Sequence, residues 1–261
     1  MNLPLPLAKF WSRAEPVLRA DKRLIGVLAA GSAISGEMDE YSDLDLILVV
    51  RDDDYDALFA DRAAYPARIP GLISSFIGYH VGEPRLVITL FEDPLVHVDF
   101  KFAKLESLGD RIETPVALID EAGVLRARLA AGTAAWPNRD AQWFEDRFWT
   151  WMHYGAVKIA RGELFEALGF LADVRKLVLG PLLARRHGRN QREIRRIETL
   201  DPEFAARMRA TICGLDRDEA WAALHAAMTL YVELRADALP PTLHVKAERA
   251  VRAWIEAQRR L

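Results

Sequence analysis

The sequence predicts an α+β protein in two parts: a mixed sheet with flanking helices over residues 1–135, then a helical bundle over residues 136–261. Two observations predict this division. Short runs rich in Val, Ile and Phe, broken by Gly, Pro and Asp, fill the chain from about residue 24 to 120. After WPNRD, residues 136–140, apolar residues recur at spacings of three and four, which is the period of a helix.

The first part is expected to open with a helix near residues 9–20. A second helix is expected near 53–64, because its acidic start suits the positive end of a helix dipole. Strands are expected in five runs that are rich in β-branched and aromatic residues: RLIGVLAA, LDLILVV, ISSFIGYHV, RLVITLF and LVHVDFKF.

The second part consists of long segments rich in Ala, Leu, Arg and Glu. Connectors as short as DPE and GLDRD suit helices that lie antiparallel in a bundle. The periodic segments predict helices near 140–162, 164–187, 201–214, 217–238 and 244–260.

Composition excludes several classes of protein. The chain of 261 residues is 51% hydrophobic with a net charge of −3, which argues against nucleic acid as its main partner. The single cysteine, Cys213, cannot form a disulfide framework or a thiolate metal site within one chain. The chain holds no apolar run approaching the ~20 residues that span a bilayer, and its start lacks the pattern of a signal peptide. We therefore expect a soluble cytoplasmic protein without a membrane partner.

Two aspartates, Asp43 and Asp45, open the apolar strand in SDLDLILVV. Side chains alternate between the faces of a strand, so both carboxylates share one face while the leucines between them point to the core. Carboxylates about 6–7 Å apart along a strand repel each other unless a cation lies between them. Mg²⁺ prefers oxygen ligands and commonly binds one or two carboxylates together with substrate phosphates. The pair therefore predicts a magnesium site.

Gly31 and Ser32 follow the preceding strand directly. Glycine permits close backbone approach, free N–H groups at a helix start attract phosphate, and Ser32 adds a hydroxyl donor. Together with the aspartates, this turn predicts a site for a nucleoside triphosphate, with ATP expected, and its Mg²⁺. The alternative is an ordinary Gly-Ser turn followed by a polar strand entry.

A third carboxylate, Asp99, lies in the strand LVHVDFKF. Its face also carries His97 and Lys101, and the opposite face is apolar. If this strand neighbours the strand of Asp43, then Asp99 joins the pair as a third metal ligand or as the general base for an acceptor hydroxyl. The alternative is a solvent-exposed sheet face with an ordinary ion pair.

The order Gly-Ser, Asp-x-Asp and a later lone Asp resembles the nucleotidyltransferase fold shared with DNA polymerase β. Within that superfamily the chain is most similar to the lincosamide nucleotidyltransferases, which have a C-terminal helical domain, and more distantly to the aminoglycoside 6-adenylyltransferases. The resemblance extends over most of the chain, in DKRLIGVLAAGSAISGEMDEYSDLDL, ALIDEAGVLRARL, WPNR and KIARGELFEAL.

The resemblance implies an N-terminal nucleotidyltransferase domain, a cleft between two domains, and a homodimer. It implies Gly31 and Ser32 for triphosphate binding, and Asp43, Asp45 and Asp99 for Mg²⁺ and catalysis. The implied reaction transfers a nucleoside monophosphate from a Mg²⁺-bound nucleoside triphosphate to a hydroxyl of a small molecule, with antibiotic resistance as the expected role. One departure is Ala33, where related enzymes often carry an arginine after the serine.

The helical part offers cations for the leaving pyrophosphate. Lys158, Arg161 and Lys176 are the candidates, with Arg175 beside them, and each also fits a solvated surface charge. The aromatic residues of FWTWMHYG could cover a nucleobase, although their helical spacing favours packing in the core. The arginine-rich segment 185–196 fits a solvated helix end, because no aromatic residues interleave for base stacking.

Other functions stay open at this point. A nucleotidyltransferase acting on protein or RNA, as in toxin–antitoxin systems, would carry the same motif, although minimal versions lack a long helical part. A nucleotide-binding regulator without catalysis would have no need to keep three carboxylates together. An interaction bundle with an incidental motif would leave the carboxylates dispersed.

Overall fold

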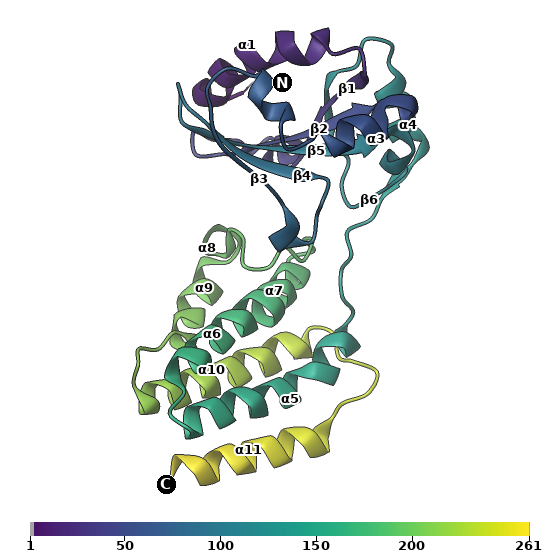
Figure 1. Ribbon diagram of the computed structural model, residues 1–261. Coiled ribbons are helices and arrows are strands. Elements are labelled where there is room, and N and C mark those ends of the chain that lie inside the picture. The colour runs from purple at the N-terminus through teal and green to yellow at the C-terminus, as the bar shows by residue number, and fades with distance from the viewer. Residues whose placement is uncertain (1–2, 261) are drawn as a thin grey trace. The chain divides into compact units, whose positions relative to one another are not determined.

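The computed structural model describes residues 3–260. The chain divides into two compact units, Met1–Trp136 and Pro137–Leu261, one residue after the boundary expected from the sequence (Figure 1). Both the α+β class and the helical character of the second unit are confirmed. Within residues 3–260, no helix is both long enough and apolar enough to cross a membrane.

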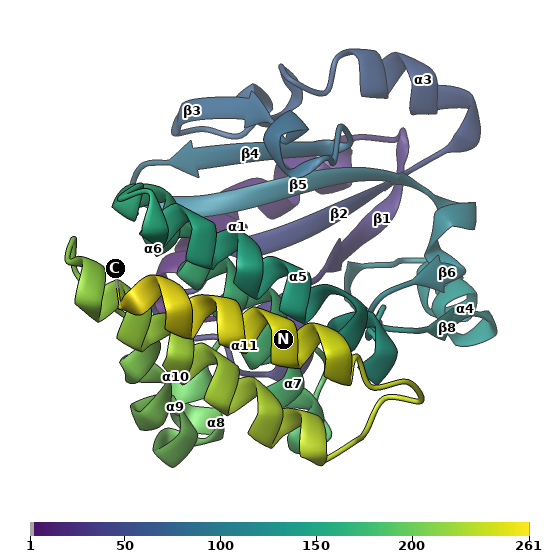
Figure 2. The same cartoon turned by 90° about the horizontal axis from the view of Figure 1, so that it is seen from below.

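A six-stranded mixed sheet forms the centre of the first unit, in the order β3-β4-β5-β2-β1-β7 (Figure 2). Strands β2 and β5 pair in parallel, and the other neighbours pair antiparallel. The strands are β1 (Leu24–Ala29), β2 (Leu44–Val50), β3 (Leu72–Ile77), β4 (Leu86–Phe91), β5 (Val96–Lys104) and β7 (Val116–Ile119), and β6 (Asp110–Arg111) pairs separately with β8 (Thr133–Ala134).

Four helices accompany this sheet. Proline stands in the first turn of α1, where its missing N–H costs nothing, and three aspartates open α3 at the positive end of its dipole. The helices are α1 (Leu5–Ala20), α2 (Ser32–Ser35), α3 (Asp52–Ala60) and α4 (Val124–Ala131), with short 3₁₀ turns at Tyr65–Arg68, Tyr79–Val81 and Leu105–Leu108.

The two faces of the sheet differ in how they are covered. One face packs its Leu, Val and Phe side chains in a core that includes Phe10 of α1 and Leu58 of α3. On the other face, a smaller core joins Leu125 of α4 to Leu28 and Val49, at the end of β2 that lies far from Asp45. The remainder of this second face, which we call the open face, carries Asp45, Ser74, Phe76, Leu86, Ile88, Leu90, His97, Asp99 and Lys101.

The second unit is all helical. Asp140, Asp201 and Asp216 cap helix starts by accepting hydrogen bonds from backbone N–H groups. The helix expected at 164–187 is one continuous run in which a π-helical turn, Arg175–Leu179, joins α6 to α7. The helices are α5 (Ala141–Ala160), α6 (Leu164–Val174), α7 (Gly180–Arg186), α8 (Ile197–Leu200), α9 (Pro202–Met208), α10 (Arg217–Ala236) and α11 (Val245–Arg259), with a 3₁₀ turn at Arg209–Thr211.

A buried carboxylate, Glu145, ties three segments of the second unit together. It accepts hydrogen bonds from the Tyr231 hydroxyl at 2.6 Å, from Arg235 at 3.1 Å and from the backbone N–H of His244 at 2.9 Å. Burial raises the pKa of Glu145, but these hydrogen bonds outweigh burial and hold the pKa below its usual value. Glu145 therefore stays ionised and links α5 to α10 and to the start of α11.

Candidate functional site

Asp45 of β2 lies opposite Asp99 of β5 in the parallel register of these two strands. Both carboxylates project from the open face, because the flanking Leu44, Leu46 and Val98 are buried on the other side. Neighbouring strands lie about 4.8 Å apart, so the two acids are close neighbours. The sequence predicted that Asp99 would join the other two acids only if its strand neighboured theirs. Strands β2 and β5 are neighbours, so this requirement is met.

Asp99 is largely enclosed, with 16% of its side chain exposed. His97 lies two positions away on the same face, and its Nε2 is 2.8 Å from Asp99 Oδ1. Burial raises the pKa of Asp99, the His97 imidazole opposes that rise, and the charge of Asp43 adds to it. Asp99 is thus held in a fixed orientation with more affinity for a proton than an exposed aspartate has.

Asp43 lies just before β2 and is exposed. Its influence on the pKa of Asp99 places it near the pair. Within residues 3–260, no three His, Cys, Asp or Glu side chains are grouped so that they could hold a metal ion. Asp45 and Asp99 form an adjacent pair, and Asp43 lies near them. That all three bind one cation together stays a prediction.

The turn after β1 lies directly on the Asp45 carboxylate. Gly31 has φ 58° and ψ −133°, which a residue with a side chain rarely adopts. A β-carbon added at Gly31 would overlap Asp45 Oδ2, and the N–H of Ala30 donates to the backbone oxygen of Asp45 at 2.9 Å. Glycine is therefore required here both by the backbone conformation and by the closeness of the acid.

Ser32 begins α2, and its Oγ is buried without a hydrogen-bond partner. A buried hydroxyl left unpaired costs about 1–3 kcal/mol, so such groups usually have a use. The neighbouring Ala33 is buried and offers no side-chain donor. An unpaired hydroxyl, a glycine turn and two adjacent carboxylates form the kind of oxygen-rich set that fits Mg²⁺ with a phosphate group.

The cations expected from the sequence are engaged elsewhere. Lys158 Nζ is 2.6 Å from a Glu163 carboxylate oxygen, and Arg161 pairs with the same glutamate at 3.8 Å. Lys176 lies 3.4 Å from Glu193. Contact with pyrophosphate would compete with these ion pairs, so phosphate binding by the three residues stays a prediction.

The other residues that the sequence singled out in the helical unit lie in different environments. Arg175 donates to the backbone oxygen of Thr211 at 2.6 Å, which is a neutral partner. The arginine-rich segment was expected to be a solvated helix end, but Nη1 of Arg185 at its start is buried without a hydrogen-bond partner. Among the aromatic residues, Trp149 is buried in the helical core, so the preference for packing is confirmed there.

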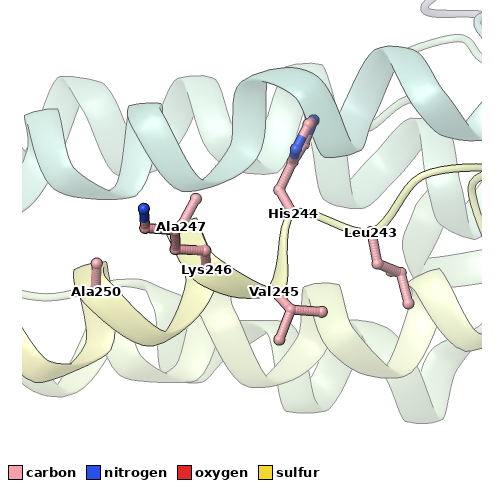
Figure 3. A pocket seen from close by; sticks show the side chains of 6 residues that line it. All are labelled: Leu243, His244, Val245, Lys246, Ala247 and Ala250. Atoms are coloured by element: carbon pink, nitrogen blue, oxygen red, sulfur yellow. The ribbon is translucent and has the colours of Figure 1, made fainter.

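A depression of about 530 Å³ lies at the start of α11, lined by Leu243, His244, Val245, Lys246, Ala247 and Ala250 (Figure 3). His244 points from it toward α5, where its Nε2 is 2.9 Å from Asp146 Oδ1. The lining is mostly apolar and contains no carboxylate. Its polar side chains are Lys246 and His244, and the imidazole of His244 is already engaged by Asp146.

A comparison of the chain with protein-family models found no match, and a comparison with curated proteins found none either. The case for a function therefore depends on the geometry around Asp45 and Asp99.

Proposed function

We propose that the chain is a Mg²⁺-dependent nucleotidyltransferase that transfers a nucleoside monophosphate to a hydroxyl of a small molecule and releases pyrophosphate. The observation that carries this proposal is the packing of the Gly31–Ser32 turn on Asp45, with Asp99 on the adjacent strand. The turn proposed to bind phosphate thus lies against one of the two carboxylates proposed to bind the cation. ATP is the expected donor.

The acids and the turn have separate roles in this proposal. Asp45, with Asp43 and Asp99 beside it, would hold Mg²⁺, which when bound neutralises charge on the phosphate oxygens. Gly31 lets the Asp45 carboxylate approach the backbone of the turn, and the Ser32 hydroxyl would donate a hydrogen bond to a phosphate oxygen. Positioning and charge stabilisation account for most of the catalysis of such transfers.

Asp99 acts as the general base. It accepts the proton of the acceptor hydroxyl as that oxygen attacks the α-phosphorus, and the bond from this phosphorus to the pyrophosphate oxygen breaks. His97 keeps the Asp99 carboxylate oriented through its hydrogen bond.

The test uses ATP, GTP, CTP and UTP labelled at the α-phosphate, with Mg²⁺ and a panel of lincosamides and aminoglycosides. Wild type should transfer label to an acceptor, and Asp45→Asn and Asp99→Asn should each lower the rate by about 10² or more. The matched control is Asp56→Asn, an exposed aspartate on α3, which should keep the wild-type rate.

Two results would contradict the proposal: full activity in Asp45→Asn, or no consumption of any nucleotide by the wild type. Label appearing on protein or RNA instead would replace the small-molecule acceptor with a macromolecule.

A further inference from the structure

Apolar side chains continue the open face beyond the acidic pair. In the antiparallel pairing of β4 with β5, Ile88 lies opposite Asp99 and Leu90 lies opposite His97. In the next pairing, Phe76 of β3 lies opposite Ile88. Side chains in register share a face, so Phe76, Ile88 and Asp99 form one row across three strands, which Asp45 extends on β2.

This apolar surface is accessible. Phe76 is 51% exposed, and Ile88 and Leu90 are half-buried. Val87 and Phe91, which flank them on β4, are buried in the core of the other face. The ring contact of Phe76 is with His80, with centroids 5.6 Å apart. An exposed aromatic residue on an apolar surface is typical of a surface that binds something.

The charges around this surface are already balanced. Lys101, on the same face, pairs with Glu83 at 2.8 Å, and Glu83 also pairs with Arg85 at 2.7 Å. The open-face residues of β3 and β4 are Ser74, Phe76, Leu86, Ile88 and Leu90, none of them charged. Glu83, whose carboxylate lies beside this face, is already paired with Lys101 and Arg85, so the open-face side chains of β3 and β4 match an apolar ring better than a polycation.

We propose that Phe76, Ile88 and Leu90 form the floor on which the acceptor lies, and that the acceptor is an uncharged molecule whose hydroxyl is carried by an apolar or aromatic ring. This inference rests on the proposed function, because it places the acceptor hydroxyl beside Asp99. With strands about 4.8 Å apart, Ile88 and Phe76 lie one and two strand spacings from Asp99, so a ring system on the floor reaches the base with its hydroxyl.

Binding is tested without nucleotide, so that it does not depend on catalysis. The full chain is titrated with 2-naphthol, an uncharged aromatic alcohol, and binding is followed by its fluorescence. Phe76→Ser and Leu90→Ser should each weaken binding about tenfold or more, and Phe76→Tyr should restore it. The control Leu5→Ser removes an exposed leucine from α1, which packs on the other face, and should bind like wild type.

Transfer is tested separately, with aromatic alcohols and polycationic aminoglycosides as competing acceptors. A preference for the aromatic alcohols, with a KM that rises in Phe76→Ser, would support the floor. Equal naphthol binding in wild type and Phe76→Ser, or transfer to aminoglycosides alone, would overturn it. A wild-type dimer that dissociates in Phe76→Ser would also overturn it, by assigning the surface to a second copy of the chain.

Failure of the floor and failure of the proposed function give different results. Naphthol binding that requires Phe76, with no nucleotide consumed, would keep the floor and reject the nucleotidyltransferase. Nucleotide transfer that requires Asp45 but does not change in Phe76→Ser would keep the nucleotidyltransferase and reject the floor.

Discussion

Gly31 and Asp45 are packed so closely that a single added methyl group cannot fit between them. A β-carbon at Gly31 would overlap Asp45 Oδ2, and the same glycine has a positive φ. The turn that is expected to meet phosphate and the acid that is expected to meet the cation therefore cannot move independently.

Gly31→Ala should accordingly reduce nucleotide transfer by about 10² or more, because the methyl group displaces the Asp45 carboxylate. The matched control is Gly36→Ala. Gly36 also has a positive φ, but a β-carbon there meets nothing within 4 Å, so that variant carries only the backbone cost of about 1–2 kcal/mol. Transfer rates and urea unfolding of both variants separate the displacement of Asp45 from the backbone cost. Equal transfer rates in Gly31→Ala and Gly36→Ala would contradict a role for the contact between Gly31 and Asp45.

Ser32→Ala should weaken nucleotide binding about tenfold without lowering the free energy of unfolding. The buried Oγ has no partner within the protein, so its removal takes away an unsatisfied group and a hydrogen bond that only the ligand makes. Calorimetric titration with a non-hydrolysable nucleotide and Mg²⁺ measures the first quantity, and urea unfolding the second. Ser35→Ala, at an exposed serine of the same short helix, is the control. A loss of stability with unchanged affinity would make Ser32 a structural residue.

Glu145→Ala should destabilise the protein by about 3–5 kcal/mol, because it leaves Arg235 and the Tyr231 hydroxyl without their buried partner. Urea unfolding followed by tryptophan fluorescence measures the change, since Trp149 donates to the same carboxylate. The adjacent Asp146→Asn, which removes an exposed partner of His244, should leave the unfolding midpoint nearly unchanged. Similar midpoints for the two variants would show that burial of Glu145 matters little.

Glu83 should make stability depend on pH below about 4.5. Hydrogen bonds from Arg85 and Lys101 lower the pKa of Glu83 from 4.5 to about 2, so its stabilisation is complete above the unfolded-state pKa and is lost as the pH falls toward the folded-state pKa. Between pH 7 and pH 3, wild type should lose about 1–2 kcal/mol more than Glu83→Gln, allowing for partial solvent screening. Urea unfolding at both pH values measures the difference, with the exposed Glu106→Gln as control. Parallel losses in wild type and Glu83→Gln would contradict the contribution of Glu83.

The alternation of buried and exposed side chains along a single strand could be predicted from the sequence. In LDLILVV the leucines at 44, 46 and 48 are buried, as the period of two predicts. The same period could not show which strands are neighbours, because pairing depends on contacts between distant segments. One strand end was also wrong: β3 stops at Ile77, because Gly78 turns the chain into the 3₁₀ segment Tyr79–Val81 and accepts a hydrogen bond from Glu83 N–H.

The partners of charged side chains were less predictable than the strands. Lys158 and Arg161 lie at the end of α5, three residues apart, and residues at that spacing share one face of a helix. Gly162, with φ 73°, reverses the chain there and brings Glu163 back to Lys158. Helical periodicity does not describe a residue that lies beyond the end of the helix. The ion pair between Lys158 and Glu163 could therefore not be predicted from the spacing of residues in α5.

The parallel register of β2 and β5 has a consequence for how this protein can vary over time. The two acids owe their proximity to the strands themselves, so the loops between Arg51 and Leu95 can lengthen or shorten without separating them. An insertion of a single residue inside either strand would instead turn the following side chains over, moving carboxylates toward the core and leucines toward the open face. Tolerance to length change should therefore be broad in the loops of this crossover and absent within the strands.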